Sequence, residues 1–567
     1  MDWINSYYGW CFFVDIEKRR YELKENRLPK FEKDKIYVDT QDILLLIDGV
    51  IFNIKELILE EKVKTWEECV TKIAGKDVHF FSRFRGSFNG LYLDKKNGIC
   101  YIFGDQIGTH PLFYYKNEQF FIATSNFNYL YEFMKEKNII PQLNEMAVKY
   151  MLSFGAMIDK STYYKGVFRL LGGECLEYQL ERKRYVVSKY FEFDNESEKF
   201  KSEEEILEAL DKSFKKAIER EFEKDKEYGL RSLVDISGGM DSRMVCFGAK
   251  ERGYTNILNI CMSQMNAVER KVAEQNVKLL GFDYVFSSLD NANFIYDIDE
   301  IVKLNYGLAY VASVTGALKN IKMLKTNELG IHHTGILGDI HDGSFVEDDV
   351  QKKPSMDGNK YYMSKINKFE FSEFNISQYK NQEMYLFNTR GILFGLTSNL
   401  IRQSVTETFS PFCDVEFLNT FFGISLHDRV SKKILQKWVI ERYSDANKVV
   451  YGNTGARLGV NLYYRKVKSL FRRIKNEVLK PMLYKCHIPV DITPQNSMNP
   501  FEYWYNTIPD FKEFINEYYV KNMPFLMRYP EVKIWCEKMY LEGKVVDKFL
   551  AMTVISVVKQ YFNGFEE

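Results

Sequence analysis

The succession of strands and helices between residues 230 and 290 constrains the fold more than any other feature of this chain. The segments SLVDIS, NILNICMS and DYVFSSL have the composition of short buried strands. The segments between them, DSRMVCFGAKERG and AVERKVAEQNVKLLG, have the composition of helices. Strands that alternate with helices in this way pair in parallel, and the helices cover the faces of the sheet. The pattern therefore predicts a parallel α/β domain in the middle of the chain.

The chain has 567 residues, which is too long for a single hydrophobic core, so we expect two or three domains. Up to about residue 195, short apolar and aromatic runs are separated by turn residues, a pattern typical of antiparallel sheet. The charged stretch NESEKFKSEEE then has the composition of a linker. Beyond about residue 360 the pattern is mostly helical. We predict domains at 1–195 and 196–460, with a helical extension at 461–567.

The composition narrows the functional class and the location. Lys plus Arg and Asp plus Glu each total 78, so the formal net charge is zero, and general nucleic-acid binding is not expected. The first residues lack the features of a signal peptide, and no run approaches the roughly 18 apolar residues that span a bilayer. The nine cysteines lack the paired spacing of a zinc site. We expect a cytoplasmic protein without stable membrane insertion, either a monomer or a homodimer.

The loop after the first predicted strand of the α/β domain carries the clearest chemical signal. It consists of Ser237, Gly238, Gly239, Met240, Asp241 and Ser242. The two glycines permit a tight turn at the start of a helix, so that backbone N–H groups and the helix dipole favour a bound phosphate. Asp241 offers an oxygen ligand to the Mg²⁺ that accompanies phosphates. The Gly-Lys-Ser/Thr signature is absent, so this is not the P-loop of ordinary NTPases.

This loop resembles the PP-loop of ATP pyrophosphatases, and later segments are similar to asparagine synthetases. NAVERKVAEQNVKLLG resembles a helix of that family, and TGILGD at residues 334–339 resembles its second acidic loop. FSPFCD at residues 409–414 resembles its Arg-x-Pro-Phe-Leu-Asp segment. The resemblance implies a parallel-sheet domain of the adenine nucleotide alpha hydrolase type. It also implies a ligase that cleaves ATP to AMP and pyrophosphate to activate a carboxylate, which ammonia or an amine then captures as an amide.

The resemblance implies ATP and Mg²⁺ as cofactors and assigns roles to single residues. Asp241 and Asp339 are expected to be catalytic and to bind the metal. Lys448 or Arg457 is expected to stabilise charge on pyrophosphate, the alternative being that each is a plain surface residue. Ile336 stands where asparagine synthetases have an acidic residue, which casts doubt on aspartate as the substrate. The nucleotide is expected to contact Ser237, Gly238, Gly239, Met240, Asp241, Ser242, Cys261, Gly335 and Gly338.

The first domain is similar to the glutaminase domain of asparagine synthetases, through GSFNG at residues 86–90 and GDQIGTHPLFYY at residues 104–115. The similarity implies an N-terminal sandwich of the Ntn-hydrolase type. The sequence departs from the family at the position of the catalytic nucleophile. Met1 is followed by Asp2, and Tyr8 stands where the family has its nucleophilic cysteine. The glutamine-binding Asn-Gly-Glu of the family appears as Asp-Gly-Val at residues 48–50. We predict that this domain does not hydrolyse glutamine and that Cys11 is an inert core residue.

Three functions remain open on these residues. The first is an amide-forming ligase that joins a small-molecule or peptide carboxylate to ammonia or an amine. The second is a macrocycle- or lactam-forming cyclase, as in lasso-peptide cyclases and β-lactam synthetases. The third is a non-catalytic protein that binds nucleotide. Retention of both Asp241 and Asp339 favours an enzyme over the third function.

Three weaker features remain. His332, His333 and His341 lie around the second loop, but their spacing fits no standard zinc site. Ordinary loop residues are the favoured interpretation, the alternative being a catalytic histidine near the acceptor. Asp342 is either a further metal ligand or a solvent-facing residue. The basic helix predicted around residues 464–480 is more typical of a solvated helix than of a membrane-binding one.

Overall fold

The computed structural model describes residues 2–313, 316–340, 345–346, 348–356, 362–430, 433–452, 455–459 and 497–565, together with positions 474, 479 and 482. His341, Asp342 and almost all of the segment 464–480 lie outside the described residues.

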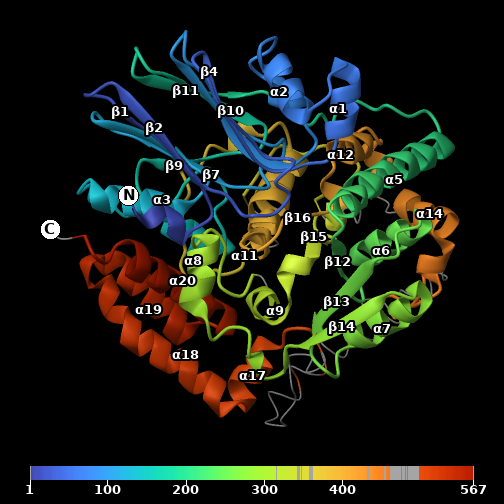
Figure 1. Cartoon of the computed structure of the whole chain (residues 1–567). Helices are drawn as coiled ribbons and strands as arrows, with labels where there is room; N and C mark the ends of the chain where they lie inside the picture. Colours follow the sequence, from blue (N-terminus) through green and yellow to red (C-terminus); the bar gives the residue numbers. More distant parts are fainter. Residues whose placement is uncertain are drawn as a thin grey trace.

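The N-terminal part of the chain is a sandwich of two antiparallel sheets (Figure 1). One sheet has the strand order β2-β1-β8-β7-β9, and the other has the order β11-β10-β6-β5-β4-β3. The strands are β1 (Gly9–Asp15), β2 (Arg20–Asn26), β3 (Ile36–Asp39), β4 (Ile43–Ile51), β5 (Gly86–Asp94), β6 (Ile99–Gly104), β7 (Leu112–Lys116), β8 (Phe120–Thr124), β9 (Val167–Leu170), β10 (Glu174–Gln179) and β11 (Arg184–Lys189).

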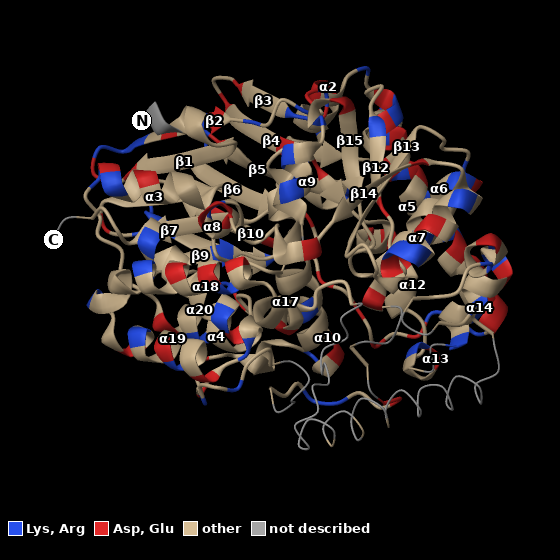
Figure 2. Cartoon of the chain, turned by 90° about the horizontal axis from the view of Figure 1, so that it is seen from below, with Lys and Arg blue, Asp and Glu red and all other residues tan. Residues whose placement is uncertain are grey.

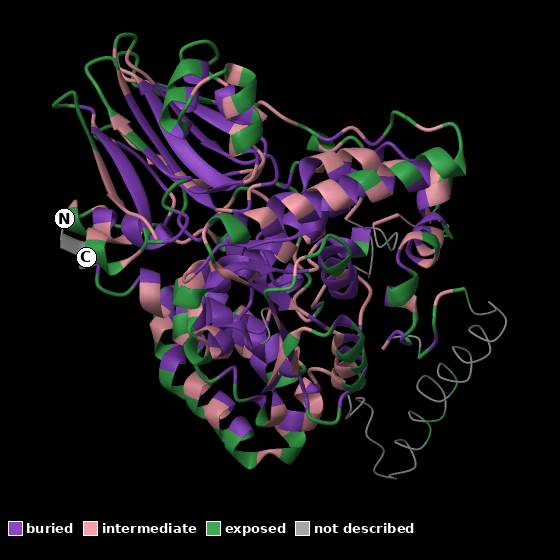
Figure 3. Ribbon diagram, turned by 45° about the vertical axis from the view of Figure 1, so that its right-hand side comes forward, coloured by how far each residue is buried: buried purple, intermediate pink, exposed green. Residues whose placement is uncertain are grey.

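Alternation along the strands builds four layers. Phe12 of β1 and Leu44 of β4 point between the two sheets, and their neighbours Phe13 and Leu45 point outward. The outward side chains pack on helices, so the sandwich is covered on both sides. Its inner strands are buried along most of their length, whereas β2, β3 and β11 are mostly exposed or half-buried (Figure 3). The covering helices are α1 (Ile54–Glu61) and α2 (Trp66–Ala74) on one side, and α3 (Phe127–Glu136) and α4 (Glu145–Phe154) on the other.

The central part of the chain contains a five-stranded sheet in which every pairing is parallel. Its strand order is β14-β13-β12-β15-β16. The strands are β12 (Arg231–Asp235), β13 (Ile257–Ser263), β14 (Asp283–Ser288), β15 (Leu329–His333) and β16 (Thr408–Phe409). The helices of this part are α5 (Glu203–Glu227), α6 (Asp241–Glu251), α7 (Val268–Leu280), α8 (Ile298–Asn305), α9 (Ala317–Met323), α10 (Gln382–Leu386), α11 (Leu400–Gln403), α12 (Val415–Phe422), α13 (Leu426–Val430) and α14 (Lys433–Arg442).

Shorter helical turns join these elements, and one π-helix, η7 (Phe387–Gly395), precedes α11. The 3₁₀ turns are η1 (Asp2–Ser6), η2 (Phe80–Arg83), η3 (Asp290–Ala292), η4 (Thr326–Glu328), η5 (Gly338–Ile340), η6 (Ile376–Gln378), η8 (Leu396–Asn399), η9 (Pro411–Cys413), η10 (Ser444–Asn447) and η12 (Met523–Arg528). A helical bundle ends the described chain and packs against α4 and α8. Its helices are α17 (Phe501–Thr507), α18 (Pro509–Asn522), α19 (Pro530–Glu542) and α20 (Val545–Tyr561).

The long helix α5 shows how local sequence fixes an element at the start of the second part. Ser202 caps its first turn by accepting a hydrogen bond from the backbone N–H of Glu205. Glu203, Glu204 and Glu205 occupy that first turn, where the helix dipole favours negative charge. Its apolar face, which includes Phe214, joins the core of the parallel-sheet part.

Buried charges join the sandwich to the parallel-sheet part. Lys224 of α5 forms an ion pair of 3.0 Å with Asp34, and both side chains are almost fully buried. Lys30 reaches across the junction and donates to the backbone carbonyls of Thr326 and Leu329. Because burying a charge is costly unless it is paired or hydrogen-bonded, these contacts favour one fixed arrangement of the two parts.

The predicted fold class is confirmed, since antiparallel sheets precede a parallel sheet that is followed by helices. The predicted boundary near residue 195 falls in a segment anchored to the second part, because Asn195 is buried and hydrogen-bonds to Asn381 at 3.2 Å. Basic and acidic side chains are interspersed over the helices seen in Figure 2. In the described part of the chain, no helix combines the length and the apolar character needed to cross a membrane.

Candidate active site

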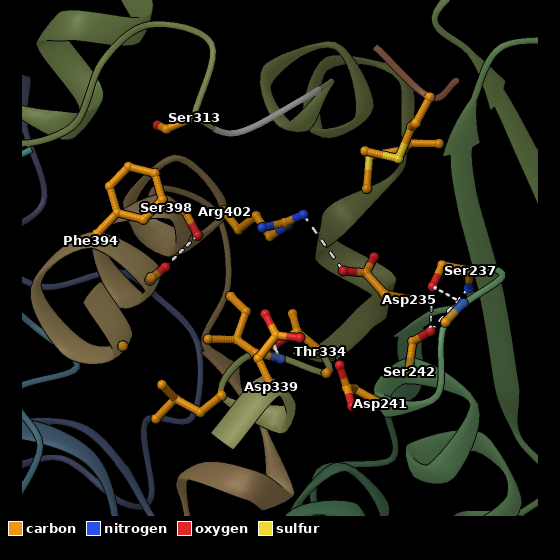
Figure 4. A pocket seen from close by; sticks show the side chains of 18 of the residues that line it. Asp235, Ser237, Asp241, Ser242, Ser313, Thr334, Asp339, Phe394, Ser398 and Arg402 are labelled. Carbon is orange, nitrogen blue, oxygen red and sulfur yellow. Dashed lines mark hydrogen bonds and ion pairs between the residues drawn. The ribbon is translucent and has the colours of Figure 1, made fainter. Parts of the chain in front are cut away.

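A cavity of about 750 Å³ lies at the carboxyl ends of strands β12, β13 and β15 (Figure 4). Open parallel sheets usually bind ligands at this edge. The loop after β12 and the loop after β15 line the cavity from one side, and the π-helix η7 lines it from another. Of the residues predicted from the sequence, six line the cavity: Ser237, Gly239, Asp241, Ser242, Gly335 and Asp339.

The first loop is held closed by its own side chains. Ser242 Oγ accepts a hydrogen bond of 3.0 Å from the backbone N–H of Ser237, and the two hydroxyl oxygens are 2.9 Å apart. Ser237 Oγ also accepts from the N–H of Gly239 at 3.1 Å. Helix α6 begins at Asp241, so its N-terminal end lies at the cavity wall. A helix N-terminus beside a tight glycine turn favours an anionic ligand such as phosphate.

The second loop is packed directly on the first, and two glycines make this approach possible. A Cβ atom added to Gly338 would stand 2.2 Å from Asp241 Cγ, and one added to Gly335 would stand 2.6 Å from the backbone nitrogen of Ser242. No side chain fits at these distances. Gly238, on the other side of the first loop, lies close to the helix α7, where an added Cβ would be 3.1 Å from Glu269 Cα.

The close approach of the two loops brings two carboxylates to one part of the cavity. Asp241 is adjacent to Gly338, and Asp339 follows Gly338 in the chain, so both side chains line the same wall (Figure 4). Mg²⁺ is usually held by one or two carboxylates together with substrate phosphates and water. The pair of Asp241 and Asp339 fits that requirement. Among the described residues, no cluster of three or more His, Cys, Asp or Glu suits a metal held by protein ligands alone.

Asp235, at the end of β12, was not predicted and links the cavity wall to His332 and Arg402. Its carboxylate lies 2.8 Å from Nε2 of His332 and 3.6 Å from the guanidinium of Arg402. Burial alone would raise the pKa of Asp235, but the charges of these two neighbours lower it below its ordinary value. Burial lowers the pKa of His332 in spite of Asp235. The Asp235 carboxylate therefore stays ionised, and its interaction partners are His332 and Arg402.

Alternation along the strands decides which predicted residues reach the cavity. Ile260 and Met262 of β13 line it, whereas Cys261 between them points to the opposite face and joins the core with α6. Burial raises the pKa of the Cys261 thiol to about 12. The same alternation sends His333 away from the cavity, to Glu221 and Asp225 of α5 at 2.9 and 2.8 Å. These positions favour a structural role for Cys261 and His333.

The two predicted cations lie outside the lining of the cavity. Lys448 is 59% exposed and pairs with Asp445 at 2.6 Å, and Arg457 is exposed. The segment that carries Lys448 is nevertheless anchored beside the first loop, since the backbone N–H of Gly452 donates to the carbonyl of Gly238 at 2.9 Å. Arg243 of α6 also holds this segment, donating to the carbonyl of Val449 at 2.8 Å.

The π-helix η7 supplies cavity residues that sequence reasoning missed. Arg390, Gly391, Phe394 and Gly395 all line the cavity from this element. Gly391 allows η7 to approach the second loop, because an added Cβ would be 3.1 Å from Leu337. Single π-turns occur frequently at functional sites, but no sequence motif marks them. The sequence predicted only that the region beyond about residue 360 is mostly helical.

A second cavity, of about 400 Å³, lies between the sandwich and the parallel-sheet part. Four of its lining residues form two pairs, Lys35 with Asp48 at 3.0 Å and His110 with Glu407 at 2.9 Å, and Lys303 lines it as well. Tyr8 also lines it. Cys11 is absent from the described lining and is only 1% exposed.

The sandwich is the part of the chain that a family model matches, and the cavity belongs to the parallel-sheet part that follows it. Residues 32–191 match the family of glutamine amidotransferase domains. Over 224 residues the chain is 26% identical to a Methanocaldococcus jannaschii protein named "Putative asparagine synthetase 2 (glutamine-hydrolyzing)". That similarity covers 38% of this chain and 42% of the relative. Residues 32–191 are thus similar to a glutamine amidotransferase domain, and 38% of the chain is similar to a protein named as an asparagine synthetase.

Two solved structures are similar to about half of the chain at low sequence identity. A glutamine phosphoribosylpyrophosphate amidotransferase from B. subtilis, in complex with ADP and GMP, is 10% identical, with a TM-score of 0.23. The match covers 51% of this chain and 86% of the B. subtilis chain. The allosteric regulatory enzyme of purine biosynthesis is 9% identical over 50% of this chain and 75% of its own, with a TM-score of 0.21.

Proposed function

We propose that this protein is an ATP-dependent ligase that forms an amide from a carboxylate and ammonia or an amine, releasing AMP and pyrophosphate. The observation that carries the proposal is the approach of the two glycine-containing loops, which places Asp241 and Asp339 together beside the N-terminus of α6. Phosphate binding at such a helix end, with carboxylates for its Mg²⁺, is what an AMP-forming step requires. The similarity to a protein named as an asparagine synthetase supports amide formation.

The residues of the chain divide the work in this proposal. The first loop, from Ser237 to Ser242, binds the phosphates of ATP through backbone N–H groups and hydroxyls. Asp241 and Asp339 would hold Mg²⁺, which neutralises phosphate charge when bound. Ile260 and Met262 offer an apolar wall beside the loop, suited to the adenine ring. The end of the cavity formed by η7 is left for the carboxylate substrate.

We further propose that the sandwich no longer hydrolyses glutamine. A nucleophilic cysteine acts as a thiolate and must be accessible. Cys11 packs on the outer face of its sheet, and burial raises the pKa of its thiol far above the ordinary range. In the second cavity, Lys35 and Asp48 neutralise each other. Free ammonia or an amine is therefore the proposed nitrogen donor.

The proposal is tested by measuring ATP–pyrophosphate exchange and pyrophosphate release with Mg²⁺, a panel of carboxylic acids, and either ammonium or glutamine. We expect at least one acid to stimulate exchange whichever nitrogen source is present, and the same acid to support sustained pyrophosphate release with ammonium but not with glutamine. Asp241→Ala should abolish the signals and Mg²⁺-dependent ATP binding.

Three outcomes separate the elements of the proposal. Turnover with glutamine as efficient as with ammonium would overturn the loss of glutaminase activity. Magnesium-dependent ATP binding without exchange for any acid would favour a nucleotide-binding protein without ligase activity. A wild-type chain that does not bind ATP would refute the proposal altogether.

A further inference from the structure

The end of the first cavity opposite the phosphate-binding loop is rich in hydrogen-bond donors that have no partner. Within the part of the chain that the structure describes, Arg390 Nη1, Arg402 Nε and Ser313 Oγ are buried without a hydrogen bond. All three residues line the cavity. Buried hydrogen-bond donors almost always have an acceptor in native structures. Several unpaired donors around one cavity therefore indicate a ligand that supplies hydrogen-bond acceptors.

Arg390 is the group with the largest unmet requirement. Its guanidinium stacks on Phe394 with 4.2 Å between its central carbon and the ring centroid, and no ion pair is recorded for it among the described residues. Burial lowers its pKa from the ordinary value, but arginine side chains stay protonated in proteins. A partly buried positive charge without a counter-charge is unfavourable until a ligand supplies one.

The other charges of the cavity are already engaged. Arg402 is 6% exposed and faces Asp235, which His332 also contacts. Asp241 and Asp339 belong to the proposed Mg²⁺ site at the opposite loops. Figure 4 shows Phe394 and Ser398 on the side of the cavity away from Ser237, with Arg402 between them. Arg390 and Arg402 at this end of the cavity can therefore bind an anion. Each carboxylate among the described lining residues already has another role, so none is left to bind an ammonium group of the substrate.

Apolar side chains complete this end of the cavity. Ile336, Phe345 and Phe394 line it beside the bare backbone of Gly391 and Gly395. Such a wall favours a carbon chain over a charged or hydrated group. The same Ile336 replaces the acid that the sequence resemblance leads one to expect.

We propose that Arg390, assisted by Arg402 and Ser313, binds a second anionic group on the carboxylate substrate, and that this substrate carries no ammonium group beside it. The substrate class is a dicarboxylic acid or a phosphorylated carboxylic acid with an apolar spacer, rather than an amino acid. The inference rests on the proposed function for the identity of the reaction. The anion-binding site itself can be tested without turnover.

The test is a calorimetric titration of the full-length protein, with and without Mg²⁺ and α,β-methylene-ATP. The titrants are glutarate, pentanoate as the matched monocarboxylate, glutamate as the matched amino acid, and 3-phosphonopropanoate as the phosphate-like anion. Charge-assisted hydrogen bonds predict that glutarate or the phosphonate binds at least about tenfold more tightly than pentanoate and glutamate. Which of the two binds more tightly distinguishes a second carboxylate from a phosphate.

The variant Arg390→Met keeps the apolar stem and removes the charge. We expect it to lose the preference for the dianion while its affinity for the nucleotide analogue stays unchanged, which also reports that it folds. Arg390→Lys should retain part of the preference, and Arg182→Met, at an exposed position in a turn, should behave as wild type. Binding of both dianions no tighter than that of pentanoate, or tight binding of glutamate, would overturn the inference.

Two results separate the failure of this inference from that of the proposed function. If Arg390→Met weakens the nucleotide analogue instead of the acid, Arg390 serves a phosphate of ATP and the substrate assignment is wrong, although the ligase proposal stands. If the wild-type protein binds the dianion but no nucleotide, the ligase proposal fails while the anion site is retained.

Discussion

The two cavities of this protein differ in how their charged groups are satisfied. Between the sandwich and the parallel-sheet part, Lys35 pairs with Asp48 and His110 pairs with Glu407. In the cavity at the carboxyl ends of the parallel strands, Arg390 and Ser313 keep donors without partners. Unpartnered donors around a cavity favour a ligand that supplies acceptors. The comparison therefore favours the first cavity as the place of the proposed chemistry.

The strongest test of this comparison is Asp241→Asn, which keeps the size of the side chain and removes its charge. We expect pyrophosphate formation to fall by about 100-fold or more, because loss of a carboxylate ligand weakens Mg²⁺ and its neutralisation of phosphate charge. Asp445→Asn is the matched control, since Asp445 is an exposed carboxylate that pairs with Lys448. Equal activity of the two variants would remove Asp241 from the site.

Glu407→Gln tests the opposite expectation for the second cavity, where the charges are structural. Leaving buried His110 without its partner should lower the free energy of unfolding by about 3 kcal/mol at pH 6. Urea denaturation measures this change, with the exposed Glu192→Gln as a control. Unaltered stability would show that the ion pair contributes nothing to the scaffold.

The same ion pair predicts a pH dependence of stability. Burial alone would lower the pKa of His110, but the nearby charge of Glu407 raises it above the ordinary 6.5. A pKa that is higher in the folded state gives stability that is complete below pH 6.5 and is lost as the pH rises through the folded-state pKa. Wild-type unfolding free energy should therefore fall above pH 6.5 more steeply than that of Glu407→Gln. Parallel profiles for the two proteins would contradict the assignment.

Gly338→Ala tests whether the close approach of the two loops matters. An added Cβ would stand 2.2 Å from Asp241 Cγ, so the carboxylate must shift. We expect magnesium-dependent ATP binding to weaken by about tenfold, because catalytic geometry tolerates little displacement. Gly75→Ala, where an added Cβ meets no atom nearer than 3.5 Å, is the control. Both affinities are measurable by calorimetry, and equal values would show that the loops can separate without loss.

Cys11→Ala has the smallest expected effect. The thiol is buried in the core under α3, so its removal should cost about 1 kcal/mol of stability. Ammonium-dependent amide formation should remain within about twofold of wild type, as for a substitution away from the active site. Glutamate release from glutamine, measured by an enzyme-coupled assay, should be absent from both proteins. Glutamine hydrolysis that disappears in Cys11→Ala would reverse the comparison between the two cavities.

The sequence alone determined the fold class and one wall of the candidate site. Turn residues and apolar alternation predicted the antiparallel part, and the succession of strands and helices predicted the parallel sheet, because both patterns are local. The loop around Asp241 and the loop around Asp339 were visible as motifs for the same reason. The glycines of these loops allow the two backbones to approach closely, and a single glycine is enough to permit such an approach.

Only the tertiary structure decided which other side chains share that cavity. Cys261 was expected at the nucleotide, but strand alternation turns it toward α6, and Lys448 lies at the surface beside Asp445. Arg390 and Arg402 carry no motif. They reach the cavity because the π-helix is folded against the second loop and the short helix α11 packs on α8 and α9, contacts that are far apart in the sequence. A sequence motif identifies the chemical groups within one loop. The end of the cavity around Arg390 and Arg402 instead depends on how separate elements pack together.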